Sequence, residues 1–415
     1  MPGLAVLSEL PPARSGAAGA GGSLVGILCR AGYRPVKADW PLTEAVEARL
    51  ASSDLGVFHV SNDLEDREIY ELAVTEPGLV VLHDVALDRL VAGLVRTEDP
   101  IGGDAGREVQ AASERVGELF PEGPLAVPWC AQLARRARGI VVHSTFAARY
   151  LEAMGCRTPV FVAPHPWAGE PSAVRRARGR ARRIRRRLGP RPVVGVTGEL
   201  GPDLRLETVL EATMRVDAHA VVIGPRVPGH EVGAAVREVG PGWATVVADP
   251  APGDVAAWIG ACDVVTDLGY PARAKVSGFL VRALQGGIPI VVGPTGRHLD
   301  WPEEAMVHVP EPQPDAAAVA RAIRPLLRDG DVRRALGARG RAVADRMAAE
   351  AVPAYRRAVD GTIALLGDPV RRSLARWAAS LRDVGAGEDD LARGYGMPYA
   401  RALAELAAAQ GPPRP

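Results

Sequence analysis

The sequence predicts two doubly wound α/β domains, each built on a parallel sheet. Short β-branched runs alternate with segments whose apolar residues recur at helical spacing, a pattern typical of parallel sheets with right-handed crossovers. Two such series follow one another, separated by a stretch rich in proline and arginine. The length of 415 residues fits two or three domains.

The predicted strands are short runs bounded by turn residues. In the first series they are Leu4–Leu7, Arg34–Ala38, Gly56–Val60, Leu79–Leu82, Ile140–Val142 and Val160–Ala163. In the second series they are Pro192–Val196, Ala220–Ile223, Thr245–Val247, Val264–Thr266, Pro289–Val292 and Met306–Val309.

The predicted helices lie between these strands and at the C-terminal end. They include Thr43–Ala51, Glu68–Thr75, Phe146–Met154, Ala316–Arg328, Val332–Ala349, Pro353–Leu366 and a last one near Tyr399–Ala409. We therefore divide the chain into a first domain (1–168), a linker helix (169–191), a second domain (192–352) and a helical tail (353–415). A tail of this kind often crosses back to the first domain.

The linker contains a run of arginines with a hidden helical pattern. Small and aliphatic residues recur every three or four positions at Val174, Ala177, Ala181, Ile184 and Leu188. Ser172 can cap the start of this helix, and Gly189-Pro190 would end it. Two interpretations stay open: a surface helix packed on the second domain, or a basic patch for anionic lipid or an acidic partner.

The composition excludes several classes of protein. With 47% hydrophobic residues, 24% charged residues and a net charge of +1, the chain is neither disordered nor a dedicated nucleic-acid binder. No apolar run reaches the length of a membrane-spanning helix. The four cysteines lack disulfide or zinc spacing, and no secretory signal is visible, so we expect a cytoplasmic protein.

In open α/β sheets, ligands bind at the carboxyl ends of strands. The first strand runs into Ser8–Gly22, whose prolines and glycines predict a loop, either a flexible connection or a ligand loop around Ser15 and Gly16. The fourth strand ends at His83 and Asp84, where an imidazole can exchange a proton with a substrate hydroxyl and Asp84 can orient it.

Three more histidines fall at or near strand ends of the first domain, so that four can converge. They are His59, His143 and His165, in addition to His83. No HxH or HxxxH spacing supports a metal site, and we expect none. An ordinary structural turn remains the alternative for His83 and Asp84.

In the second domain, Ser277 is a plausible N-cap and Gly278 permits close approach to the start of a helix over Phe279–Gln285. That helix start would offer amide groups and partial positive charge to an anion such as a diphosphate. Lys275 and Arg282 flank the turn, and Arg205 follows the first strand of this domain. The alternative is an ordinary helix start with basic residues on the surface.

Five motifs, in order and spacing, resemble glycosyltransferase family 4 and identify the chain as a divergent, actinobacterial-type member. They are LPPARSG (Leu10–Gly16), VVLHD (Val80–Asp84), VVHSTFAARYLEAMG (Val141–Gly155), VAPHP (Val162–Pro166) and SGFLVRALQGGIPIVV from Ser277. The match extends over almost the whole chain, to about Leu366.

The resemblance implies the GT-B architecture, in which two Rossmann-like domains face a cleft. It also implies transfer of a sugar from a nucleotide-diphosphate sugar, with retention, without a metal and without a further cofactor. Carried over, His83 would lie beside the sugar, with Asp84 next to it, and Ser15, His143 and His165 would line the acceptor side. Donor contacts would come from Gly16, Arg205, Lys275, Ser277, Gly278 and Arg282.

The chain departs from the family pattern in two places. A basic pair usual in the first loop of the second domain is replaced by Glu199 and Leu204, leaving Arg205 alone. Two glutamates that usually contact the sugar and the ribose are replaced by Ala274 or Lys275, and by Arg282. Lys275 reverses the charge where a carboxylate would accept hydroxyl hydrogen bonds.

Three functional hypotheses remain. The first is an active, hexosyltransferase-type glycosyltransferase, favoured by His83, Asp84, Arg205 and the Ser277-Gly278 turn. The second is a catalytically degenerate homologue that acts as partner or regulator of an active transferase, favoured by the missing carboxylates. A sugar-phosphate epimerase of the same architecture has no specific residue in its support.

Overall fold

The computed structural model describes most of the chain. The described residues are 2–10, 16–37, 46, 50, 52–76, 78–96, 100–117, 119–120, 123–227, 229–240, 242–271, 273–294, 296–298 and 300–366. Met1–Ala358 form one compact unit, which contains both sheets. Ser15 and the predicted helix near Tyr399–Ala409 lie outside the described residues.

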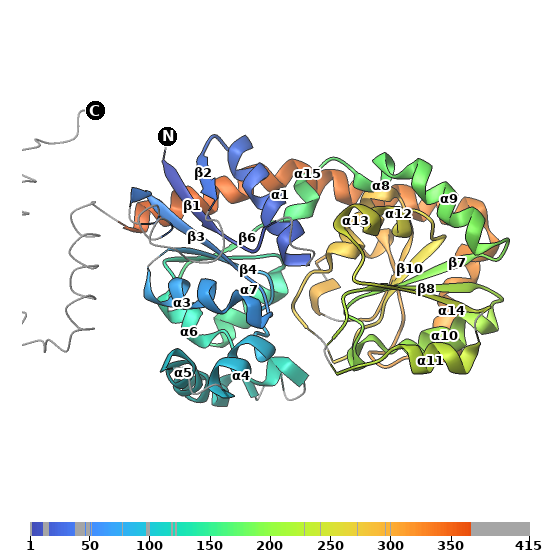
Figure 1. Ribbon diagram of the computed structural model, residues 1–415, viewed down its shortest axis with the longest axis horizontal. Coiled ribbons are helices and arrows are strands. Elements are labelled where there is room, and N and C mark those ends of the chain that lie inside the picture. The colour runs from blue at the N-terminus through green and yellow to red at the C-terminus, as the bar shows by residue number, and fades with distance from the viewer. Residues whose placement is uncertain are drawn as a thin grey trace, which may run out of the picture. The chain divides into compact units, whose positions relative to one another are not determined.

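The described strands form two six-stranded parallel sheets, as predicted (Figure 1). The first has the order β2-β1-β3-β4-β5-β6 and the second β12-β11-β10-β7-β8-β9, which is the Rossmann order read from β9. The strands of the first sheet are β1 (Gly3–Leu7), β2 (Arg34–Lys37), β3 (Leu55–Val60), β4 (Leu79–Leu82), β5 (Gly139–Val142) and β6 (Val160–Val162). Those of the second are β7 (Val193–Thr197), β8 (His219–Gly224), β9 (Ala244–Ala248), β10 (Val264–Asp267), β11 (Ile290–Val292) and β12 (Val307–His308).

Helices cover both faces of each sheet, because the central strands are buried on both sides. The first sheet is covered by α1 (Gly16–Arg30), α3 (Arg67–Thr75), α4 (Asp88–Arg96), α5 (Pro100–Gly117), α6 (Ala131–Arg136) and α7 (Thr145–Ala153). The second is covered by α8 (Ala173–Arg176), α9 (Arg178–Leu188), α10 (Leu206–Arg215), α11 (Gly233–Val239), α12 (Pro252–Ile259), α13 (Gly278–Gly286) and α14 (Ala316–Arg328). In the predicted helix Thr43–Ala51, the two described residues, Val46 and Leu50, are helical.

The predicted loop at Ser8–Gly22 is wrong from Gly16 onwards, where α1 begins. Its glycines allow close packing and do not mark a loop. A Cβ at Gly21 would lie 2.0 Å from Ser8 Oγ, and one at Gly19 would lie 3.0 Å from the Trp167 ring. Helix α1 therefore packs against the end of β1 and against Trp167 at distances that only glycine permits.

The linker helix packs on the second domain, as the first interpretation expected. Ser172 accepts a hydrogen bond from the Arg175 amide, and Gly189 ends the segment with φ +88°. Val174 and Ala181 are buried, and α8 and α9 contact α13 and α12. The single predicted helix is interrupted at Ala177, which separates α8 from α9.

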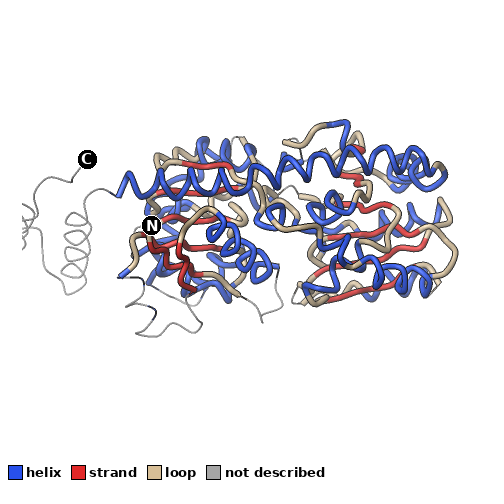
Figure 2. Tube along the Cα trace, turned by 90° about the horizontal axis from the view of Figure 1, so that it is seen from above, coloured by secondary structure: helices blue, strands red, loops and turns tan. Residues whose placement is uncertain are grey.

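The two predicted helices Val332–Ala349 and Pro353–Leu366 are one helix, α15 (Gly330–Leu366), seen as a long coil in Figure 2. Pro353 removes one backbone hydrogen bond, but burial of Ala351, Ala354 and Tyr355 holds the helix together around it. The Arg356 guanidinium donates to the Ala31 carbonyl with Nε 3.1 Å away, so α15 reaches the first domain.

Candidate functional site

Four histidines converge at the carboxyl edge of the first sheet, as the sequence predicted. His59 is the next-to-last residue of β3, and His83, His143 and His165 follow β4, β5 and β6. The His83 ring lies 5.6 Å from that of His59, 5.9 Å from that of His143 and 5.1 Å from that of His165, centroid to centroid. We call these four residues the histidine cluster.

The histidine cluster is neutral at physiological pH. Burial lowers the pKa of His59 to about 3 and that of His143 to about 4, and it lowers those of His83 and His165 well below 6.5. Lys275 lowers the pKa of His83 further. A neutral imidazole carries one N–H donor and one acceptor nitrogen, both of which a sugar hydroxyl can use.

Several ring nitrogens of the histidine cluster are buried without a hydrogen-bond partner: His59 Nε2, His83 Nδ1 and His143 Nε2. His143 Nδ1 lies 3.1 Å from the Ala163 carbonyl oxygen, so Nδ1 carries the proton and Nε2 is an acceptor. Among the described residues, no group of three or more His, Cys, Asp or Glu has the geometry to hold a metal ion. The histidine cluster thus holds buried polar atoms that the protein's own contacts leave unpaired, a feature that calls for an explanation.

Asp84 follows His83 but is held by other groups. Its carboxylate accepts from the Ala86 amide at 3.0 Å and lies 3.9 Å from the Arg273 guanidinium. Burial raises the pKa of Asp84 to about 6, against the lowering effect of Arg273 and Lys275. The contacts of the described residues include no hydrogen bond between Asp84 and the His83 ring, so its orienting role stays a prediction.

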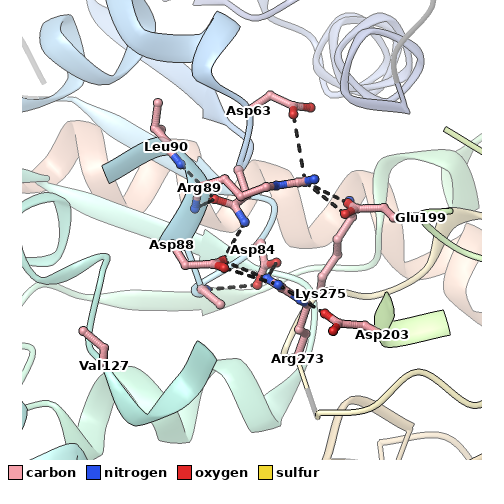
Figure 3. A network of polar contacts seen from close by, with 12 residues as sticks. Asp63, Asp84, Asp88, Arg89, Leu90, Val127, Glu199, Asp203, Arg273 and Lys275 are labelled. Atoms are coloured by element: carbon pink, nitrogen blue, oxygen red, sulfur yellow. Dashed lines mark hydrogen bonds and ion pairs between the residues drawn. The ribbon is translucent and has the colours of Figure 1, made fainter. Parts of the chain in front are cut away.

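The loops after β7 and β10 form an ion-pair network with α4 of the first domain (Figure 3). Glu199, after β7, accepts from Lys275 Nζ at 3.0 Å and from Arg89 Nη2 on α4 at 3.1 Å. Lys275 and Arg89 lower the pKa of Glu199 to about 2, so this carboxylate is ionised. Lys275 is therefore already paired with an acid, and its contact with a donor stays a prediction.

The second half of this network centres on Arg273. Its guanidinium donates to Asp88 at 2.8 Å and to Asp203 at 3.4 Å, joining α4 to the loop after β7. With Asp63 at 3.9 Å from Arg89, five carboxylates face three cations here. The network links α4 to the loops after β7 and β10, and it contains more carboxylates than cations.

Helix α13 begins at Gly278 after Ser277, as predicted, and ends at Gly287 with φ +69°. The Ser277 hydroxyl makes no capping hydrogen bond. The space beside Gly278 is occupied by the protein itself, since a Cβ there would lie 2.6 Å from the Trp167 ring and 3.3 Å from His165 Cε1, and close approach of a ligand to Gly278 stays a prediction. The first turn of α13 is thus covered on one side by Trp167, beside the histidine cluster.

Arg282 points away from the network and is 8% exposed. Its guanidinium donates to Glu170 at 2.7 Å and lies 4.6 Å above the Trp167 ring. Glu170 also accepts from the Ser23 hydroxyl on α1. These contacts fix α13 to the linker and to α1, and a contact of Arg282 with a donor stays a prediction.

Arg205 is not part of the ion-pair network. Its guanidinium donates to the Pro314 carbonyl at 3.2 Å and lies 3.3 Å from Gln313 Oε1, and its backbone is left-handed with φ +54°. The structure thus brings together His83, His143, His165, Lys275 and Gly278, with Asp84 at the edge. It places Arg205 and Arg282 on other partners, and Gly16 is the first residue of α1.

Sequence reasoning missed Arg89, Glu199, Arg273 and Trp167. Arg89 lies in an ordinary amphipathic helix, and its partner Glu199 is 110 residues away. One signal was present: Glu199 and Lys275 each carry the charge opposite to that usual in the resembled family. Two reversed charges of opposite sign in one family site indicate an ion pair.

The fold matches solved glycosyltransferases of GT-B architecture. Sucrose-phosphate synthase from Thermosynechococcus elongatus matches with a TM-score of 0.60 and 17% identity, covering 90% of this chain and 100% of that one. HepE of Anabaena, solved in complex with UDP-glucose, gives a TM-score of 0.58 at 13% identity, over 88% and 100% of the two chains. The catalytic domain of Arabidopsis thaliana starch synthase IV, bound to ADP and acarbose, matches with a TM-score of 0.55 and 11% identity, covering 88% of this chain and 99% of that one.

No protein-family model matches the sequence. No curated protein matches it either. No helix among the described residues is long and apolar enough to cross a membrane.

Proposed function

We propose that this protein is a hexosyltransferase-type glycosyltransferase that moves a sugar from a nucleotide-diphosphate sugar to an acceptor. It would act in the cytoplasm, with retention and without a metal, as an actinobacterial-type member of family 4. The observation that carries the proposal is that the histidine cluster of the first sheet lies against Gly278, at the start of α13, with Lys275 close by. The fold similarity to HepE, solved with UDP-glucose, supports the donor class.

The proposed roles follow from the chemistry of each group. The diphosphate would lie between Lys275 and the α13 amides at Ser277 and Gly278, whose partial positive charge stabilises the leaving group. The transferred sugar would lie beside His83, whose neutral ring exchanges hydrogen bonds with its hydroxyls. His143 and His165 would line the acceptor side. Catalysis would then rest on positioning and electrostatic stabilisation.

The second candidate, a degenerate homologue that serves as partner or regulator, is favoured by the ion-pair network. Lys275 is paired with Glu199, and Arg273 is surrounded by carboxylates. A doubly negative ligand must displace part of this network before it can bind. A regulator has no need to do so, and its cleft would stay closed by the same ion pairs.

Binding of nucleoside diphosphates separates the two candidates. We expect calorimetric titration of UDP, ADP or GDP into the protein to show one site per chain, accompanied by a thermal shift that grows with ligand concentration. Lys275→Gln should weaken that binding by about tenfold or more, through loss of one charged contact. An absence of binding by all three nucleotides would support the regulator.

The exposed arginines of α8 and α9 support a further proposal about location, a weak peripheral contact with anionic membrane. No ion pair is found among the described residues for Arg178, Arg182, Arg183, Arg186 or Arg187, and all five are exposed. Basic residues near an anionic surface each contribute about 1 kcal/mol, so several on one helix suffice for reversible binding.

Vesicle co-sedimentation tests this contact. We expect binding to phosphatidylglycerol-containing vesicles at low salt and none to phosphatidylcholine vesicles. Replacing Arg182, Arg183, Arg186 and Arg187 by Gln should weaken binding by roughly three orders of magnitude. Replacing four ion-paired arginines elsewhere (Arg107, Arg135, Arg215 and Arg226) changes the net charge equally and should have much less effect. Equal losses in both variants would reject a specific basic surface.

A further inference from the structure

We infer that Arg89 and Lys275 form an anion-binding site that the Glu199 carboxylate fills in this structure, and that a phosphate group of an incoming ligand takes its place. Arg89 extends the ligand site into the first domain, so that one anion is held by both domains. The inference depends on the proposed function only for the nature of the ligand, a nucleotide with a diphosphate.

The geometry is that of a bound anion. Glu199 Oε1 lies 3.0 Å from Lys275 Nζ and 3.1 Å from Arg89 Nη2, while Oε2 lies 3.0 Å from the same Arg89 nitrogen. The cations come from different domains, and the carboxylate comes from a third segment, the loop after β7. Two cations that converge on one carboxylate would hold a phosphate oxygen at similar distances.

The backbone at Arg89 is held in place independently of Glu199. Its backbone amide donates to Asn62 Oδ1 at 2.9 Å, and the Asn62 side-chain amide donates to Asp88 at 2.8 Å. The start of α4 is therefore held by Asn62, and the guanidinium projects from a rigid base toward Glu199. A preorganised cation loses little freedom when it binds an anion.

Arg89 also has an unused donor. Its Nε is buried and has no hydrogen-bond partner, because Glu199 occupies only the terminal nitrogen. A carboxylate offers two oxygens, whereas a diphosphate offers several and can bond Nε and Nη2 together in the bidentate geometry that guanidinium groups favour. The ligand thus satisfies a donor that Glu199 leaves unpaired.

Glu199 can leave, because the pair is open to solvent. The side chains of Arg89, Glu199 and Lys275 are each about one third exposed, at 32%, 32% and 31%. Ion pairs at this level of exposure contribute little to stability and exchange readily. Glu199 therefore acts as a competitor tethered within the protein, which weakens binding of any anion at this site until it is displaced.

The test is calorimetric titration of inorganic pyrophosphate, and separately of UDP, into the full-length wild type and single variants. Glu199→Gln should raise the affinity for pyrophosphate by about tenfold or more, because it removes the competing charge and keeps the side-chain shape. Arg89→Gln and Lys275→Gln should each lower it by a similar factor. Glu211→Gln, which removes an exposed carboxylate paired with Arg215 on α10, is the matched control and should change nothing.

The inference is overturned if Glu199→Gln binds pyrophosphate no more tightly than the wild type, or if no variant binds it. If Glu199→Gln does not fold, pyrophosphate affinity is measured with Glu199→Asp in its place, because the shorter side chain cannot reach both cations. Release of nucleoside diphosphate from nucleotide sugars is measured in the same proteins. If Glu199→Gln binds pyrophosphate more tightly but no protein releases nucleoside diphosphate from nucleotide sugars, the proposed function is rejected and this inference stands. If nucleoside diphosphate is released but Glu199→Gln binds pyrophosphate no more tightly than the wild type, this inference is rejected and the proposed function stands.

Discussion

Replacing Gly278 by alanine is expected to lower the free energy of unfolding by about 1–3 kcal/mol, the usual cost of overpacking a filled space. The new methyl group would lie 2.6 Å from the Trp167 ring, which is 7% exposed and cannot retreat. On its other side, Trp167 meets Gly19 of α1, where a Cβ would lie 3.0 Å from the ring. Urea denaturation followed by circular dichroism measures the loss.

A double-mutant cycle shows whether the ring is the cause. Trp167→Ala alone should cost about 3–5 kcal/mol, as for other buried aromatic truncations. In that background, Gly278→Ala should cost almost nothing, so the two changes should couple strongly. Gly179→Ala on the exposed face of α9 is the control and should stabilise by about 0.5–1 kcal/mol. If Gly278→Ala lowered the free energy of unfolding by the same amount in the Trp167→Ala background as in the wild type, the Trp167 ring would not be the cause.

Acid should destabilise the protein strongly, because the histidine cluster is buried in its neutral form. The native pKa values of His59 (about 3) and His143 (about 4), with those of His83 and His165 also well below 6.5, are depressed. Below pH 6.5 these histidines bind protons in the unfolded chain but not in the native state. The free energy of unfolding that they contribute above pH 6.5 is therefore lost as the pH falls. Each histidine contributes at most about 1.4 kcal/mol per pH unit.

Two buried carboxyl groups oppose this effect. Burial raises the pKa of Asp84 to about 6 and that of Asp66 to about 7, so their contribution to stability is present below pH 3.8 and is lost as the pH rises through those values. Four histidines outweigh two carboxyls, and we expect a net loss of several kcal/mol between pH 6.5 and 5.

Urea unfolding at a series of pH values checks the sign. His143→Gln should reduce the slope of stability against pH by about one proton, because it removes one of the four groups. His230→Gln, at an exposed position outside the histidine cluster, is the matched control. A protein more stable at pH 5 than at pH 7 would show that the histidine cluster is not neutral in the native state.

Much of the fold could be predicted from the sequence because each buried strand is a compact β-branched run. Leu79–Leu82 has the predicted bounds, and the parallel pairing of the strands follows from their alternation with helices. Helix α1 could not be predicted, since its glycines are typical of a loop until Trp167 and the end of β1 are in place. Pro353 predicted a boundary that packing in α15 overrides.

The candidate site was predictable only where a local rule applies. The carboxyl ends of parallel strands meet at one edge, so convergence of the histidines followed from their positions in the sequence. The ion-pair partners of Lys275 and Arg282 could not be predicted in this way, because Glu199 and Glu170 come from segments far away in the sequence. Tertiary contacts therefore decide which of these cations a ligand can reach.

The most direct test of the central claim, sugar transfer at this site, is incubation of the wild type with a panel of nucleotide-diphosphate sugars, followed by NMR. The account predicts release of nucleoside diphosphate from at least one donor, with the sugar first appearing in the donor's own anomeric configuration. It also predicts a loss of roughly 100-fold or more in His83→Gln. Absence of nucleoside diphosphate release from every donor, or equal release by wild type and His83→Gln, would contradict it.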